Sequence, residues 1–159
     1  MKATTTAALA AMVLAVASPG PAAAAPTDAS GGPIAAAVTP ATYAAVTAAL
    51  AKVGAPYASG AAGPDAFDCS GLTLWALART GIAVPHSSYA QYALGTAVPR
   101  SDIQRGDLVF FDSAGTGASH VGLATGPTTA VSATNHGVMT HPIFDAYWGA
   151  HYVGARRLG

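Results

Sequence analysis

Phe67-Asp68-Cys69-Ser70-Gly71 contains the single cysteine of the 159-residue chain and governs how the surrounding sequence is interpreted. One cysteine cannot form an internal disulfide or a cysteine-rich zinc site. It is therefore a buried packing residue, one half of a bridge to another chain, or a nucleophile. The apolar run from Leu72 to Arg79 predicts a helix directly after it, with Asp68 as the N-cap and Gly81 as the glycine stop.

The position of Cys69 favours the nucleophile. A thiol in the first turn of a helix lies near unpaired backbone N–H groups, whose partial positive charge favours the thiolate. The run Ser119-His120-Val121-Gly122-Leu123 predicts a strand that begins with a histidine, which offers a base to a thiol on a distant helix. We therefore expect the helix N-terminus and His120 together to increase the thiolate fraction of Cys69.

The composition argues against several classes of function. Seven Lys plus Arg residues balance seven acidic residues, all of them Asp, so the formal net charge is 0. Such a chain has no basic stripe for nucleic acid and no glutamate for a paired-carboxylate glycosidase site. The spread of His136, His141 and His151 lacks a His-Glu-x-x-His helix or a cysteine pair, so we expect neither a metal nor another cofactor.

The N-terminal residues predict targeting rather than folded structure. Residues 1–25 have the pattern of a secretory signal peptide: Lys2, an apolar stretch too short to span a bilayer, and a small-residue cleavage region. Residues 26–40 are rich in Pro, Gly and Ala and predict a linker. A single domain is expected over residues 41–159, in a secreted protein that is not membrane-bound after cleavage.

Helical patterns precede strand patterns in this domain. Thr39-Pro40 opens a helix that Gly54 closes, and a short helix begins at Ser87 or Ser88 and stops at Gly95. Apolar runs separated by turn residues then predict five strands. These are Leu108 to Phe111, His120 to Thr125, Ala130 to Thr134, Gly137 to Ile143, and Tyr152 to Leu158. Helices followed by an antiparallel sheet predict an α+β domain.

Taken together, the motifs resemble the NlpC/P60 family of papain-like cell-wall cysteine peptidases, over roughly Tyr43 to Gly159. The matching residues are Ala55-Pro56-Tyr57, Phe67 to Leu72, Val84-Pro85 with Gln91, Arg105 to Phe111, and His120-Val121-Gly122. The resemblance implies a papain-like NlpC/P60 fold, in which N-terminal helices pack on a small antiparallel β-sheet. It also implies Cys69 as nucleophile and His120 as base.

At the residue that orients the base, the sequence departs from the family pattern. The family usually has a histidine, asparagine or glutamine about twelve residues after the base, where this sequence has Ser132. The Ser132 hydroxyl can accept the ring N–H directly or through water. His136 or Asn135 can substitute, with strand parity favouring His136, or the site is weakened. His141 and His151 are interpreted as surface or core histidines.

The resemblance also implies the substrate. We expect a bacterial, secreted endopeptidase that cleaves peptidoglycan stem peptides, with the γ-D-glutamyl–diaminopimelate bond as target. Tyr57, Asp68 and Ser70 are the candidate substrate contacts, and His86 is expected at the rim of the site. Two alternatives remain: a weakly active or inactive peptidoglycan-binding module, motivated by Ser132, and a secreted effector with amidase or acyl-transfer activity.

Overall fold

The computed structural model describes residues 37–159. The signal peptide predicted for residues 1–25 lies outside the described residues, as does all but the end of the linker predicted for residues 26–40. Across residues 37–159, none of the helices combines the length and the apolar character that a membrane span requires.

Three helices occupy the first half of the described chain, each with a hydroxyl or carboxylate N-cap. Helix α1, Pro40–Leu50, is capped by Thr39, and α2, Cys69–Ala78, is capped by Asp68. The short α3, Ser88–Tyr92, is capped by Ser87. Each cap accepts a bond from a backbone N–H that has no partner within its helix. The helix starts predicted from the sequence are confirmed.

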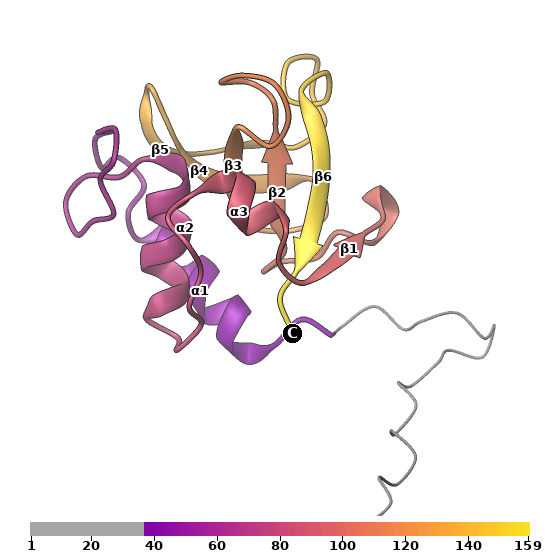
Figure 1. The fold of residues 1–159 in the computed structure, drawn as a ribbon, viewed down its shortest axis with the longest axis horizontal. Helices are drawn as coiled ribbons and strands as arrows, with labels where there is room; N and C mark the ends of the chain where they lie inside the picture. Colours follow the sequence, from indigo (N-terminus) through magenta and orange to yellow (C-terminus); the bar gives the residue numbers. More distant parts are fainter. Residues whose placement is uncertain (1–36) are drawn as a thin grey trace, which may run out of the picture. The chain divides into compact units, whose positions relative to one another are not determined.

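The second half forms a six-stranded antiparallel sheet in the order β1-β6-β2-β3-β4-β5 (Figure 1). The strands are β1 Thr96–Val98, β2 Leu108–Phe111, β3 His120–Ala124, β4 Thr129–Thr134, β5 Gly137–Pro142 and β6 Tyr152–Arg157. A 3₁₀ turn, Arg100–Asp102, follows β1. The five strands predicted from the sequence are confirmed within a few residues, whereas β1 and the 3₁₀ turn were not predicted.

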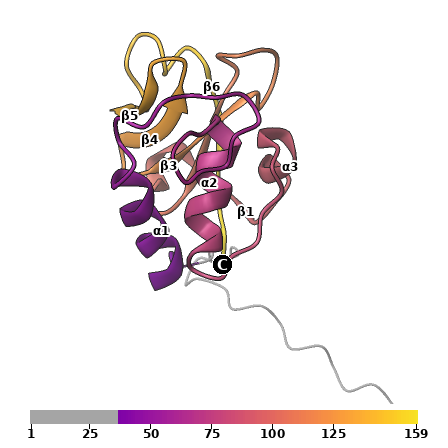
Figure 2. The same ribbon diagram turned by 90° about the vertical axis from the view of Figure 1, so that its left-hand side faces the viewer.

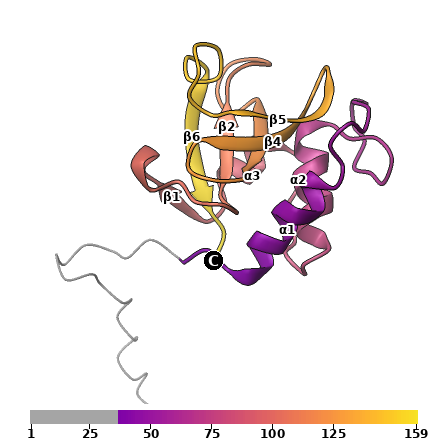
Figure 3. The ribbon, with the colours of Figure 1, turned by 180° about the vertical axis from the view of Figure 1, so that it is seen from behind.

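Alternation along the strands gives the sheet two buried faces. Leu108 and Phe110 of β2 pack with residues of α1 and α2, whereas Val109 and Phe111 pack in a second cluster on the opposite face. The two helices contact each other and cover one side of the sheet, as the other views show (Figure 2 and Figure 3). Helices packed on one face of an antiparallel sheet give the α+β arrangement expected from the sequence.

One ion pair lies inside the domain. Arg157, near the end of β6, donates from Nε and Nη2 to the two carboxylate oxygens of Asp107 at 2.7 and 2.8 Å. Asp107 is fully buried and also accepts from the backbone N–H of Gln104 at 2.8 Å. The pair holds the start of β2 against the last strand, β6. Because β2 also pairs with β3, it helps to position β3.

Candidate active site

Cys69 is the first residue of α2, and the preceding residue holds that helix end in place. One Asp68 carboxylate oxygen accepts from the Gly71 N–H at 2.6 Å, and the other accepts from the Gly60 N–H at 2.8 Å. The His86 ring nitrogen Nε2 lies 2.9 and 3.0 Å from these same two oxygens. Asp68 thus joins the helix N-terminus, the preceding loop and the segment before α3.

Gly71 allows this loop to approach the helix. A Cβ added to Gly71 would overlap the carbonyl oxygen of Ala61. The Asp68 N–H also donates to that carbonyl at 2.8 Å. The glycine after Cys69-Ser70 is therefore required by the close contact between the start of α2 and the loop at Ala61.

The backbone N–H of Val121 donates to the Cys69 sulfur, which places the start of α2 against the start of β3. Burial nevertheless raises the pKa of the Cys69 thiol above its ordinary value of 9.0, and the Asp68 carboxylate adds to the increase. The N–H groups of Val121, Ser70 and Cys69 act in the opposite direction. The expected increase in thiolate is thus wrong for the resting site, because desolvation outweighs the helix N-terminus.

His120, Ser132 and His141 lie on the neighbouring strands β3, β4 and β5. The His120 Nε2 lies 3.1 Å from the Ser132 Oγ, and this oxygen lies 2.9 Å from the His141 Nε2. The His141 Nδ1 lies 2.8 Å from the carbonyl oxygen of Pro142. All three side chains are buried, with exposed fractions of 6%, 0% and 4%.

Burial also controls the charge of the two imidazoles. It lowers the pKa of His120 from 6.5 to about 4, with His141 as a second cause in the same direction. The pKa of His141 is lowered by burial too, against opposing effects of Pro142 and Asp145. At neutral pH the resting site therefore combines a thiol with two neutral imidazoles, and proton transfer must accompany attack.

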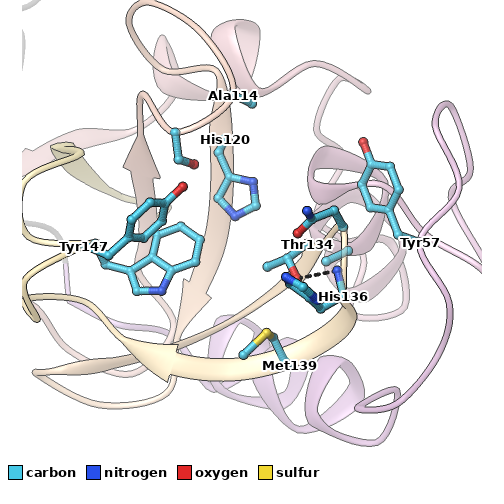
Figure 4. A pocket seen from close by; sticks show the side chains of 11 residues that line it. Tyr57, Ala114, His120, Thr134, His136, Met139 and Tyr147 are labelled. Atoms are coloured by element: carbon cyan, nitrogen blue, oxygen red, sulfur yellow. Dashed lines mark hydrogen bonds between the residues drawn. The ribbon is translucent and has the colours of Figure 1, made fainter.

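A groove of about 640 Å³ opens beside His120. In Figure 4, His120 lies between Tyr147 on one side and Thr134 and His136 on the other, with Tyr57 at the far wall. The complete lining is Tyr57, Ser113, Ala114, His120, Ala133, Thr134, Asn135, His136, Met139, Tyr147 and Trp148. A cleft of this size, with aromatic walls and a few polar groups, suits a small peptide.

Of the three predicted substrate contacts, only Tyr57 lines the groove. Tyr57 lines the groove and is 43% exposed, and the charges of Cys69 and Asp68 contribute to raising the pKa of its hydroxyl after burial. Asp68 and Ser70 do not line the groove, and the Ser70 hydroxyl donates to Asp68 at 3.3 Å. His86, expected at the rim, does not line the groove, and its ring bonds the Asp68 carboxylate.

Of the candidates for orienting His120, Ser132 is the one that the structure places against the ring. His136 and Asn135 line the groove at the turn after β4, where the His136 N–H donates to the Thr134 hydroxyl at 3.1 Å. His151 is partly exposed and bonds Asp112 at 2.7 Å.

His141 is buried, which is one of the two positions expected for it, but its bond to Ser132 was not predicted. The hairpin turn at Asn135-His136 was the available signal. A two-residue turn pairs Thr134 with Gly137 and hence Ala130 with His141, which places His141 on the Ser132 face. Within residues 37–159, no group of three or more His, Cys, Asp or Glu side chains is arranged to hold a metal ion.

Comparison with known sequences gives one family. The model of the NlpC/P60 family matches residues 54–157. A "Probable endopeptidase" of Corynebacterium glutamicum is 52% identical over 84 residues, which are 53% of this chain and 38% of that protein. The "Probable endopeptidase p60" of Listeria seeligeri is 43% identical over 106 residues, 67% of this chain and 20% of that protein. The chain thus spans well under half the length of these two relatives.

Solved structures give the same result for the fold. An NlpC/P60 family protein from Bacillus cereus superposes with a TM-score of 0.68 at 31% identity, covering 75% of this chain and 40% of that one. The P60 domain of an antigen from Mycobacterium avium subspecies paratuberculosis has a TM-score of 0.63 at 26% identity. That match covers 74% of this chain and 93% of the domain.

Proposed function

The chain belongs to the NlpC/P60 family, and from this premise we propose that it is a secreted bacterial cysteine peptidase that cleaves peptidoglycan stem peptides. The observation that carries the proposal is the contact between the Val121 N–H and the Cys69 sulfur. This contact supports the proposal because Val121 follows His120, and His120 lines a peptide-sized groove. The relatives named as endopeptidases support the reaction class.

Cys69 and His120 carry the proposed chemistry. The Cys69 proton passes to His120 as the sulfur attacks the carbonyl carbon of the scissile amide. The C–N bond breaks as His120 returns that proton to the leaving amine. Water then adds to the thioester, its proton passes through His120 to the sulfur, and the free carboxylic acid leaves. Ser132 is proposed to orient the His120 ring throughout.

The oxyanion needs donors that are already in position. The backbone N–H of Cys69 and the Tyr57 hydroxyl are the proposed pair, because the N–H donates to the reacting sulfur and the hydroxyl is close enough to feel its charge. Asp68 and Ser70 are proposed to meet the stem peptide by exchanging part of their internal hydrogen bonds for bonds to the ligand. The proposed target is the γ-D-glutamyl–diaminopimelate bond.

Mass spectrometry of defined wall fragments tests this proposal. Disaccharide tripeptides and tetrapeptides are incubated with the mature protein under reducing conditions, and with Cys69→Ala as the matched control. We expect a cut between D-glutamate and the third residue with the wild type alone, and retained ligand binding by the variant. A cut at another bond would contradict the assigned target. Binding without cleavage by both proteins would instead make the chain a peptidoglycan-binding module.

A further inference from the structure

The three side chains that follow one another across β3, β4 and β5 form a continuous hydrogen-bonded chain, which we name the histidine relay: His120, Ser132 and His141. It ends on a backbone carbonyl, that of Pro142, 2.8 Å from the His141 Nδ1. A relay with such an end has a defined direction, because a carbonyl oxygen only accepts hydrogen bonds.

The direction can be followed from that end. At 2.8 Å from the Pro142 oxygen, the His141 Nδ1 must carry a hydrogen, since a bare nitrogen would face a bare oxygen. Burial keeps His141 neutral, so its Nε2 has no hydrogen and can only accept. The hydroxyl hydrogen of Ser132 is then directed to His141.

The remaining bond sets the state of His120. With its hydrogen directed to His141, the Ser132 oxygen presents lone pairs to the His120 Nε2 at 3.1 Å. That nitrogen must therefore donate, so the single ring hydrogen of neutral His120 lies on Nε2. The Nδ1 of His120 is left without a hydrogen and can accept a proton.

We propose that His141 is a positioning residue, which acts through Ser132 to hold His120 in the Nε2–H tautomer and so keeps Nδ1 available for the proton of Cys69. This inference rests on the proposed function. It gives Ser132 and His141 together the role of orienting the base, for which the family usually has one histidine, asparagine or glutamine. During attack His120 becomes an imidazolium, and the aligned dipoles of Ser132 and His141 present their negative ends to that charge.

The setting of the relay fits this role. Trp148 stacks on His141 with ring centroids 3.9 Å apart and planes 21° from parallel. The centroid of the Trp148 ring also lies 5.4 Å from that of the His120 ring. Ser132 is fully buried. Since water has little access to the relay atoms, a substituted partner is not readily replaced by solvent.

Tautomer assignment in the wild-type protein is the first test. Histidine side-chain ¹⁵N signals, recorded at neutral pH on the labelled protein, distinguish Nδ1–H from Nε2–H, and single substitutions assign the five histidines. We expect His141 as Nδ1–H and His120 as Nε2–H. The opposite tautomer at either residue would overturn the proposal. The readout needs neither substrate nor turnover, so it stands apart from the test of peptidase activity.

Coupled substitutions form the second test, read as the alkylation rate of Cys69 by iodoacetamide. Ser132→Ala and His141→Leu should each lower that rate about tenfold, the worth of one net hydrogen bond. The double variant should lose no more than either single one, whereas independent losses that multiply would refute a shared pathway. His141→Gln, whose amide oxygen can accept from Ser132, should retain most of the rate.

A control separates the relay from general effects of losing a histidine. His151→Leu removes a ring that bonds Asp112, outside the relay, and should leave the His120 tautomer unchanged. His141→Leu should instead allow the hydrogen of His120 to distribute over both nitrogens. If His120 keeps a pure Nε2–H signal in folded His141→Leu, His141 does not set it. If His141→Leu does not fold, the tautomers of His120 and His141 in the wild-type protein still test the proposal.

Discussion

Gly122 and Ser132 lie across from each other on β3 and β4 with no space for another methyl group between them. A Cβ added to Gly122 would lie 3.0 Å from the Ser132 Cβ and 2.9 Å from the Val131 carbonyl oxygen. The glycine of His120-Val121-Gly122 is therefore a requirement of the relay, because it lets the Ser132 hydroxyl stand beside the imidazole.

We predict that Gly122→Ala separates Ser132 from His120. The added methyl must displace the β4 backbone or the serine, which should lower the free energy of unfolding by about 1–3 kcal/mol and the Cys69 alkylation rate about tenfold. Gly126→Ala is the matched control, because its Cβ would meet only the Thr129 hydroxyl, at an ordinary 3.6 Å. Equal alkylation rates in the two variants would contradict the close packing.

The relay also shows which part of the site was accessible from sequence. Asp68 before Cys69 and a histidine at a strand start are local patterns. The first predicted where α2 begins, and the second predicted where β3 begins. The bond between Ser132 and His141 depends on the register of β4 against β5, which pairs Ser132 with Met139 and so places His141 diagonally on the same face. Register follows from the turn, whereas Asn135 and His136 were considered from the sequence as substitutes for the orienting residue.

Two other features had no local signal. Strand β1 has three residues, of which only Val98 is buried, so no alternating pattern marks it. The burial of Cys69 arises only in the folded chain, where segments far from the cysteine in sequence, such as the start of β3 at Val121, pack against the helix end. For that reason the helix N-terminus predicted more thiolate at Cys69 than the folded site allows.

We predict that the pH profile of Cys69 reports this burial. Because burial raises the thiol pKa above 9.0, the iodoacetamide alkylation rate should still be increasing above pH 9. The urea-unfolded chain is the control, and its rate should level off near the ordinary thiol value. A plateau of the folded protein's rate at neutral pH would indicate a resting thiolate–imidazolium pair and contradict the neutral site.

His120 should make the fold sensitive to acid. Its pKa is about 4 in the folded protein against 6.5 ordinarily, so as pH decreases the unfolded chain binds the proton first. Stability from this group is complete above pH 6.5, decreases between 6.5 and about 4, and changes little below. The total loss is about 3 kcal/mol.

Urea unfolding of the wild type and of His120→Phe measures this contribution. The phenyl ring has a similar size and does not titrate, so the variant should lose less stability than the wild type between neutral pH and pH 4.5. The carboxylates remain in both proteins and cancel in the difference, so the difference reports His120 together with its coupling to His141. Parallel pH profiles would show that His120 binds its proton equally well in both states.

The final prediction concerns Arg157, whose guanidinium is bound by the buried carboxylate of Asp107 and by the carbonyl oxygen of Asp102 at 2.8 Å. Arg157→Met leaves Asp107 as an uncompensated buried charge and should lower the free energy of unfolding by about 3–5 kcal/mol. Arg156→Met is the matched control. Its guanidinium lies over the Tyr92 ring at 4.6 Å, a contact worth about 1 kcal/mol.

Urea unfolding of the two arginine variants, together with Arg157→Met combined with Asp107→Leu, distinguishes a buried ion pair from general packing. The double variant removes both charges and should regain a large part of the loss, because the main cost in Arg157→Met is the unpaired carboxylate rather than the missing contact. If the double variant is as unstable as Arg157→Met, the loss comes from packing at β6. If Arg156→Met destabilises the domain equally, the Asp107 pair has no special weight in joining β2 to β6.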